Sequence, residues 1–510
     1  MLDAYDDLTV RDDVKITHFS TKPFAISYVI TGLLEFSAIS NSIQMEFELT
    51  TKYPVLFHMV GASLRTSEIK FEKKLTGLIR FSVSGNEIKS ENSSIKELVR
   101  KTPQHPWASS VLLNLTYSPA LENKYYIPMN KIWIDFFGRL FEIPDHENIL
   151  EIPWDGSFAS IIMSRCYPEF AWSNMMVIFE SIHPDGRIPQ IRIGRDFMTN
   201  RTNPPVWFVA IDELFKTAPD VEMMKKLIPL LTKNYIWFND NRRNSAESGM
   251  PHTFSWGTDM TSLDNLSQTK GKLGAMMESG LDDSPIFDDM ELKGNLLNYA
   301  CIDLSCLIYR ANEILISWSR NTKLRSLFSA EEIRMIEIDN HYFRKTIHEF
   351  FCFEKSLANS FKIIDGKKSF SDTLTPLSFY QLLTSYLFND EILLLSNLYH
   401  SEHFTNRDNP SIVLPSLSFK DKQLNLDGDY WRGRIWPPSV YLAAMGFKNY
   451  NITIYKDIKT KAESILAVEW QRHGHVHENY SGLTGKGEPC KDIYARSCPL
   501  YSWGGLLGII

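Results

Sequence analysis

The chain has 510 residues, of which 44% are hydrophobic and 23% are charged, and its formal net charge is −7. This balance is typical of a globular protein and excludes a disordered or fibrous chain. The negative charge also argues against nucleic acid as a partner, because phosphate binding needs clustered Lys and Arg. The six cysteines contain no Cys-x-x-Cys pair. We therefore expect reduced thiols in the core rather than a zinc ribbon or a disulfide framework.

The amino terminus, Met1-Leu-Asp-Ala-Tyr-Asp-Asp-Leu8, is acidic and has neither the basic nor the apolar region of a signal peptide. No apolar run reaches the ~18 residues of a membrane span. We expect a cytoplasmic protein with no membrane partner, although an exported form with its signal removed would read the same. The sequence gives no indication of the oligomeric state.

The first part of the chain has the pattern of strands. Between about residues 14 and 120, short apolar runs rich in β-branched and aromatic residues alternate with turn residues, and Ile43–Leu49 alternates apolar and polar side chains. This pattern predicts an all-β sandwich domain over residues 1–125. The polar stretch 84–106, which ends at Pro103 and Pro106, is predicted to be a loop.

After about residue 130 the apolar period becomes that of helices. Helices are predicted near 131–143, 155–166, 169–181, 204–217, 219–239, 292–319, 329–349, 376–388, 390–401, 436–447, 453–473 and 502–510. These segments suit six helical hairpins. We therefore predict a mainly α fold, with an (α/α)6 toroid (six-hairpin barrel) as a catalytic domain over residues 126–510. Pro229 is expected to kink or divide its segment.

The stretch from 239 to 292 is polar, too irregular for a helix and too long for a passive connection. It contains the segment Glu278-Ser-Gly-Leu-Asp282-Asp-Ser-Pro285, and a second acidic segment, His477-Glu478-Asn-Tyr-Ser-Gly, follows far along the chain. A glycosidase needs one carboxylic acid to protonate the departing oxygen and one carboxylate to activate water or attack carbon. We predict that Asp282 and Glu478 are these catalytic residues.

An acid must stay protonated near neutral pH, and either Asp283 or Glu278 could supply the negative charge that raises the pKa of Asp282. The plainer alternatives are an Asp in an ordinary turn and a surface Glu beside Asn479. We prefer the catalytic interpretation because the two segments occur together.

Aromatic residues complete the predicted site. The run Tyr430-Trp-Arg-Gly-Arg-Ile-Trp436-Pro-Pro438 offers indole faces for sugar rings and an Arg for hydroxyls. The predicted substrate-binding residues are Trp154, Asp155, Arg195, Asn203, Trp256, Trp431, Arg432 and Trp436. Trp154 with Asp155 could equally be a core Trp beside a helix cap. Tyr430 and Trp503 could serve only in packing.

Two other chemistries fit single segments of the chain. The alternating His473, His475 and His477 could in an extended chain hold a metal, but glycoside hydrolysis requires none, so we predict no metal and no cofactor. The acidic run Asp282–Asp289 superficially resembles the magnesium-diphosphate clusters of helical terpenoid synthases. Pro285 breaks the helix which that cluster would need.

The acidic and aromatic segments, with Trp154-Asp-Gly-Ser-Phe158, Asn203-Pro-Pro205, Ser255-Trp-Gly257 and Ser502-Trp-Gly504, resemble glycoside hydrolase family 63, and the chain is also similar to the related trehalases. The resemblance covers about residues 150–510. It implies an (α/α)6 barrel and an inverting reaction, with Asp282 as general acid and Glu478 as general base. Two positions depart from the family pattern: Arg434 stands where Pro is more usual, and Asp283 where Asn often follows the acid.

Together these observations predict an inverting exo-α-glycosidase that cleaves an α-glucosidic or α-mannosidic bond of a short oligosaccharide or small glycoside. Arg434 is the position where an acidic leaving group would be expected. Two alternatives stay open: a glycoside phosphorylase on the same toroid, and a non-catalytic carbohydrate-binding protein.

Overall fold

The computed structural model describes residues 106–112, 114–118, 124–128, 150–193, 197–199, 201–258, 271–406, 408–425, 430–473, 475–487 and 497–510, together with short strands between residues 13 and 81. The predicted helix over 131–143 and the predicted binding residue Arg195 lie outside the described residues. Within the described part, no helix is both long and apolar enough to cross a membrane.

Short strands are present in the first part of the chain, where the alternating pattern predicted them. β3 (Gln44–Glu48) pairs in parallel with β1 (Asp13–Lys15) and antiparallel with β5 (Glu68–Phe71). The other pairings are those of β4 (Val55–Phe57) with β6 (Ile79–Phe81), and of β7 (Thr116–Ser118) with both β2 (Ala25–Ile26) and β8 (Lys124–Tyr126). That these strands pack as a two-layer sandwich stays a prediction.

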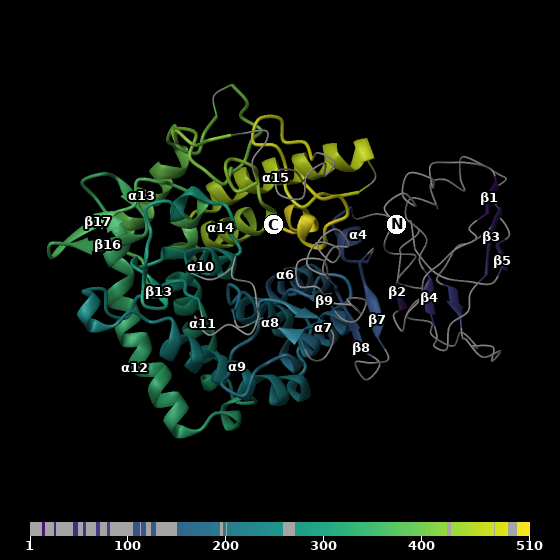
Figure 1. The fold of residues 1–510 in the computed structure, drawn as a ribbon, viewed down its shortest axis with the longest axis horizontal. Coiled ribbons are helices and arrows are strands. Elements are labelled where there is room, and N and C mark those ends of the chain that lie inside the picture. The colour runs from purple at the N-terminus through teal and green to yellow at the C-terminus, as the bar shows by residue number, and fades with distance from the viewer. Residues whose placement is uncertain are drawn as a thin grey trace.

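Contacts between helical elements close an inner ring. Each of its elements contacts the next, and the last contacts the first. In order around the ring they are α6 (Pro153–Met163), α8 (Trp207–Thr217), α11 (Ile302–Arg320), η8 (Pro376–Leu383), α14 (Pro437–Tyr450) and η9 (Ser502–Gly508). Figure 1 labels α6, α8, α11 and α14 of this ring. Every residue of α6 and of η8 is buried, as expected for helical segments enclosed on all sides.

A second set of helices lies outside this ring, each against one or two inner elements. These are α4 (Pro106–Leu112), α7 (Pro168–Glu180), α9 (Val221–Asn241), α12 (Ala330–Thr346), α13 (Asn389–His400) and α15 (Ile452–His473). α12 buries only a narrow stripe and extends along the outside of the ring in Figure 1. Inner and outer elements alternate along the chain, which is the arrangement of an (α/α)6 toroid.

The remaining elements are short and lie in the connections between helices. The strands are β9 (Leu150–Glu151), β10 (Arg192–Ile193), β11 (Phe197–Met198), β12 (Leu292–Lys293), β13 (Leu296–Leu297), β14 (Phe351–Cys352), β15 (Leu357–Ala358), β16 (Phe361–Ile364) and β17 (Lys367–Phe370). The short helices are η3 (Ala246–Ser248), α10 (Lys272–Ser279), η5 (Pro285–Phe287), η6 (Arg325–Leu327) and η7 (Ile347–Phe350).

Three details of the predicted helices are wrong. α4 begins where the predicted loop 84–106 ends, in the predicted all-β domain, and α10 lies in the stretch 239–292, where no helix was predicted. Both helices are short, so their apolar periodicity is weak. The predicted segment 292–319 begins with the β12–β13 hairpin, and α11 starts only at Ile302. Pro229 does not divide its segment, because α9 continues through it from Val221 to Asn241. That Pro229 kinks the helix stays a prediction. The domain boundary at 125 stays a prediction, although α4 precedes it and packs on η9.

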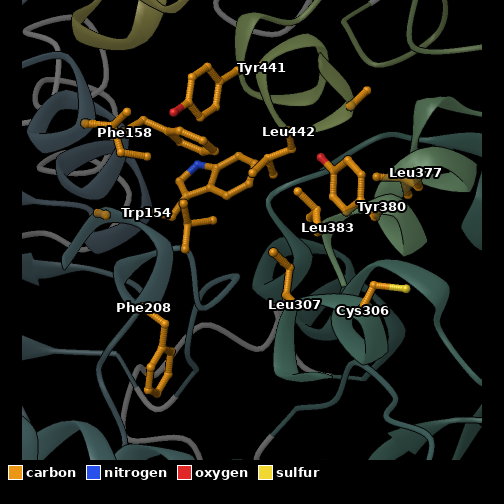
Figure 2. Packing of buried hydrophobic residues seen from close by; sticks show 14 of the residues in the cluster. Trp154, Phe158, Phe208, Cys306, Leu307, Leu377, Tyr380, Leu383, Tyr441 and Leu442 are labelled. Atoms are coloured by element: carbon orange, nitrogen blue, oxygen red, sulfur yellow. The ribbon is translucent and has the colours of Figure 1, made fainter. Parts of the chain in front are cut away.

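The core fills the middle of the ring. Figure 2 shows side chains from several inner elements pointing toward one another, among them Trp154 of α6, Leu307 of α11, Tyr380 of η8 and Leu442 of α14. Trp154 stands at the beginning of α6 and is only 5% exposed. The segments that bear the predicted site are connections joined to this rigid ring, an arrangement often used to hold functional residues.

Candidate active site

The predicted acid follows a sharp turn at the end of α10. Gly280 ends the helix with φ of +71°, a conformation that L side chains rarely adopt. A Cβ at this position would lie 3.1 Å from Cζ2 of Trp154, so the glycine also permits the close approach of the chain to that indole. The turn leads through the buried Leu281 to Asp282, which is partly exposed. We name residues 279–284 the acid turn.

Glu278, just before the acid turn, serves a different purpose from the one predicted. Its fully buried carboxylate forms a two-pronged ion pair with Arg242, with Nε–Oε1 and Nη2–Oε2 distances of 2.6 and 2.7 Å. It also accepts hydrogen bonds from the backbone N–H groups of Thr202 and Gly257, both at 3.2 Å. Glu278 therefore fastens α10 to two other connections, and it is not among the charges that raise the pKa of Asp282.

The predicted base is held from several sides. Glu478 is completely buried, and its Oε1 accepts a hydrogen bond of 2.8 Å from the Tyr430 hydroxyl. Its Oε2 accepts one of 3.2 Å from the backbone N–H of Cys498. The backbone carbonyl of Glu478 accepts a further bond of 2.8 Å from Nε1 of Trp503. Donors aimed at both oxygens suit a carboxylate that acts as an acceptor.

Three carboxyl groups lie close enough for their charges to act on one another. Burial raises the pKa of Asp282 to about 7, and the negative charges of Asp283 and Glu478 add to the shift. Burial also raises the pKa of Asp155 well above its usual value, with further contributions from Glu478 and Asp282 and a partial offset from the hydrogen bond of Tyr501. All three carboxyl groups were predicted for the site from the sequence, Asp282 and Glu478 as catalytic residues and Asp155 as a substrate-binding residue; the structure adds that their charges act on one another.

An aromatic cluster connects these carboxyl groups. Trp431 and Trp436 stack face to face, with ring centroids 3.8 Å apart and planes 5° from parallel. Trp503 packs edge-on against Trp436 at 6.0 Å and against Trp154 at 5.6 Å. Tyr430 meets Trp436 edge-on at 4.6 Å. The predicted aromatic residues 154, 431 and 436 thus belong to one continuous cluster.

Two tyrosines and one tryptophan contribute more than the sequence indicated. From the sequence, Tyr430 and Trp503 could serve only in packing, yet both hydrogen bond to Glu478. Tyr501 was not predicted at all; its hydroxyl donates to Oδ2 of Asp155 at 2.7 Å. The only available signal for Tyr501 was its position directly before the Ser502-Trp-Gly504 signature.

Arg432 lies at the edge of the site with a quarter of its side chain exposed. Its Nε is 3.9 Å from Oδ2 of Asp283, its Nη2 is 3.7 Å from Oδ1 of Asp288, and its Nη1 hydrogen bonds to Gln423. Asp283 in turn accepts a 2.8 Å hydrogen bond from the backbone N–H of Trp431. These contacts join the acid turn to the aromatic loop, by which we mean residues 430–436.

The other predicted binding residues are buried beside the acid turn. Trp256 is completely buried and its indole N–H donates to Oδ2 of Asp303 at 2.8 Å. Asn203 is 2% exposed and follows Thr202, whose N–H binds Glu278. Both flank the connections that Glu278 joins, and neither is in the aromatic cluster described above.

The sequence also singled out Arg434 and the histidines. Arg434 is completely buried, and its Nε donates to Oδ1 of Asn479, beside the base. His477 is buried with its Nδ1 3.0 Å from Oε1 of Glu469. Among the described residues, no group of three or more His, Cys, Asp or Glu side chains is arranged to hold a metal ion.

A ring of paired helices that carries two acidic segments and a tryptophan cluster suits a glycoside hydrolase, which needs two carboxyl groups and an apolar surface for sugar rings. Residues 149–503 match the family model described as the mannosylglycerate hydrolase MGH1-like glycoside hydrolase domain. Since this match spans most of the chain, the chain belongs to that family. The predicted family 63 resemblance and the predicted enzyme class, a glycoside hydrolase, are both confirmed.

One curated relative shares a quarter of its aligned residues with the chain. The chain is 25% identical over 287 residues to a probable mannosyl-oligosaccharide glucosidase of Schizosaccharomyces pombe, and the match covers 54% of this chain and 33% of that protein. The chain thus spans about a third of the length of this curated relative.

Solved structures confirm the toroid. The mannosylglycerate hydrolase of family 63 from Thermus thermophilus, solved in complex with glucose, matches with a TM-score of 0.55 at 18% identity, over 70% of this chain and 92% of that one. Neutral trehalase Nth1 from Saccharomyces cerevisiae matches with a TM-score of 0.50 at 14% identity, over 71% and 70% of the two chains. At these identities the likeness establishes the fold alone.

Proposed function

We propose that the chain is an inverting exo-α-glycosidase that hydrolyses an α-glucosidic or α-mannosidic bond of a short oligosaccharide or small glycoside. The observation that supports this most is the contrast between two neighbouring carboxyl groups. Asp282 has a pKa raised to about 7, whereas Glu478 receives hydrogen bonds on both of its oxygens. Carboxyl groups whose environments differ in this way are suited to divide the roles of acid and base.

In this mechanism Asp282 holds its proton near neutral pH and gives it to the glycosidic oxygen as the bond to the anomeric carbon breaks. Glu478 takes a proton from the water that attacks the anomeric carbon from the opposite face, so the configuration at that carbon inverts. Tyr430 and the N–H of Cys498 keep the carboxylate of Glu478 in one orientation before the reaction. After each turnover Glu478 releases its proton to solvent and Asp282 takes one up from solvent.

The non-reducing sugar would lie against the aromatic cluster. Stacked indoles offer a flat apolar surface to the C–H face of a pyranose ring. Asp155, held by Tyr501, would accept or donate hydrogen bonds to sugar hydroxyls. The similarity to a probable mannosyl-oligosaccharide glucosidase and to a mannosylglycerate hydrolase supports a glucosyl or mannosyl group at this position.

The leaving group is proposed to be uncharged. Arg434, the residue expected to meet an acidic leaving group, is completely buried and donates to Asn479. Arg432 is the partly exposed arginine of the same loop, but two carboxylates, Asp283 and Asp288, already lie within 4 Å of it. An anionic leaving group would have to compete with both of them.

The test is turnover of a matched panel: α-glucosides and α-mannosides, each with a neutral leaving group or with glycerate. We expect hydrolysis of at least one neutral glycoside, and loss of it in Asp282→Asn and in Glu478→Gln. A preference for glycerate would overturn the uncharged leaving group. Turnover that depends on added phosphate would point to the phosphorylase, and binding of the panel without turnover to the carbohydrate-binding protein.

A further inference from the structure

Asp283 is the residue directly after the proposed acid, and the proposed mechanism gives it no role. Its Oδ1 accepts a 2.8 Å hydrogen bond from the backbone N–H of Trp431, and its Oδ2 is 3.9 Å from Nε of Arg432. Its side chain is 40% exposed, so it lies at the rim rather than inside the site. One short side chain therefore contacts two consecutive residues of the aromatic loop.

This contact links the two halves of the site. The indole of Trp431 stacks on that of Trp436, and the backbone position of Trp431 sets where its ring lies. The acid turn is fixed on its other side by Glu278 and by the approach of Gly280 to Trp154. Asp283 is thus the point at which the anchored acid turn holds the start of the aromatic loop.

Resting on the proposed function, we propose that Asp283 is a positioning residue for the general acid: it holds the aromatic loop against the acid turn and places a negative charge beside Asp282. The charge acts in the same direction as burial. It disfavours ionisation of Asp282. After burial, the charge of Asp283 raises the pKa of Asp282 more than the charge of Glu478 does. The hydrogen bond from Trp431 to Asp283 forms whatever the protonation state of Asp282.

Other charges face the same place and limit the effect. Glu478 acts on Asp282 from the base side, and Asp155 interacts with Asp282 from α6. Arg432 carries the opposite charge and lies 3.9 Å from Asp283 and 3.7 Å from Asp288. Tyr430, which is hydrogen bonded to Glu478, stays neutral because burial, followed by the charges of Glu478 and Asp282, raises its pKa well above its usual value. Removing the charge of Asp283 alone therefore leaves a smaller, still positive shift on Asp282.

The chain offers a matched pair of variants. Asp283→Asn removes the charge but keeps an oxygen that can accept from the N–H of Trp431. Asp288→Asn removes the other carboxylate near Arg432, at an exposed position that is not among the groups acting on Asp282. Asp283→Ala removes both the charge and the acceptor.

The measurement is the pH profile of kcat/KM for each variant on a neutral α-glycoside. In Asp283→Asn the alkaline limb should move to lower pH by roughly 1 unit, the low end of what a neighbouring charge causes, because the side chain is partly exposed. Asp288→Asn should leave the limb in place. Asp283→Ala should show the same displacement together with a several-fold higher KM, because the loop with Trp431 is no longer held.

A limb in Asp283→Asn that coincides with the wild type, or an equal displacement in Asp288→Asn, would overturn the proposal. The proton on Asp282 can also be followed without turnover, by carbon NMR of aspartate carboxyls in which the Asp282 signal is the one lost in Asp282→Asn. A lower pKa of that signal in Asp283→Asn is expected, and an unchanged one contradicts the inference. If no glycoside is hydrolysed but the titration shifts, the proposed function fails while the placement of Asp283 stands.

Discussion

The acid turn and the segment around the base are anchored in different ways. Glu478 is completely buried, and the bonds that hold it reach its own carboxylate and backbone: Tyr430 and Cys498 bind the carboxylate oxygens, and Trp503 binds the carbonyl. Asp282 is partly exposed, and the anchoring contacts fall on its neighbours instead. Glu278 fixes the turn before it, and Asp283 fixes the loop after it.

This difference matches the two roles. A base that must stay ionised benefits from donors at its oxygens, whereas an acid that must stay protonated benefits from burial near negative charge and from few donors. Contacts of neighbouring residues therefore fix the position of Asp282, and burial and nearby negative charges set the pKa of its carboxyl group.

The largest effect is expected from removing each carboxyl group. Asp282→Asn and Glu478→Gln should each lower kcat on an alkyl glycoside by about 10²–10⁴-fold, the usual contribution of acid–base catalysis. The two variants should part on a glycosyl fluoride, whose leaving group needs no proton. There Asp282→Asn should recover most of its activity and Glu478→Gln should not. Equal recovery in both would contradict the division of roles.

The anchor of the acid turn should matter for stability. Glu278→Gln leaves Arg242 as a buried charge without its ionised partner, and breaking such a pair costs about 3–5 kcal/mol. Glu213→Gln is the matched control, because Glu213 forms a 2.9 Å ion pair with Arg165 that is partly exposed. It should cost less than about 1 kcal/mol. The free energy of unfolding of both variants is measured by denaturant titration. An equal decrease in the two variants would contradict the anchoring role of Glu278.

Asp282 should make the protein less stable at high pH. Its pKa is raised to about 7, so the folded chain binds this proton more tightly than the unfolded chain does. Stability is therefore lost as pH rises from about 4 to above 7, by roughly 2–4 kcal/mol in all. Asp282→Asn should be more stable than the wild type at pH 8, and this difference in unfolding free energy should be clearly smaller at pH 4.5. The same difference in unfolding free energy at both pH values would mean that the carboxyl group is not held neutral.

The smallest effect is expected from removing one of the donors to the carboxylate of Glu478. Tyr430→Phe removes one hydrogen bond to the carboxylate of Glu478, and a bond to a charged group is worth about 1.5–3 kcal/mol. We expect kcat to fall by roughly 10–100-fold while KM changes little. Tyr309→Phe is the control, since its buried hydroxyl donates to the carbonyl of His252 away from the site. A similar loss of kcat in both variants would indicate a general effect of removing a buried hydroxyl.

Long helices and acidic segments could be predicted from the sequence because their signals are local. α15 has an apolar stripe formed by Ile454, Ile458, Ala462 and Ile465. The two acidic segments carry glycines close to their carboxyl groups, at Gly280 and Gly482. α10 escaped detection because it is short and interrupted by Gly274. Tyr501 escaped because its partner, Asp155, is far away in the sequence.

Glu278 illustrates why some roles cannot be predicted. Its position four residues before the acid suggested an electrostatic neighbour, but its side chain points to Arg242 and to two connections from elsewhere in the chain. Sequence spacing gives proximity along the backbone, and the direction of a side chain depends on how α10 ends. The same holds for Arg434, which lies within the aromatic run but is buried beside Asn479.

The most direct test of the central proposal is proton NMR of the sugar in the first minutes of hydrolysis of an α-glucoside and an α-mannoside. If Asp282 and Glu478 act as acid and base on opposite faces of the sugar, the β-anomer appears first and the α-anomer follows only by mutarotation. An α-anomer that appears first would mean retention through a covalent intermediate, and the proposed division of roles between Asp282 and Glu478 would be wrong.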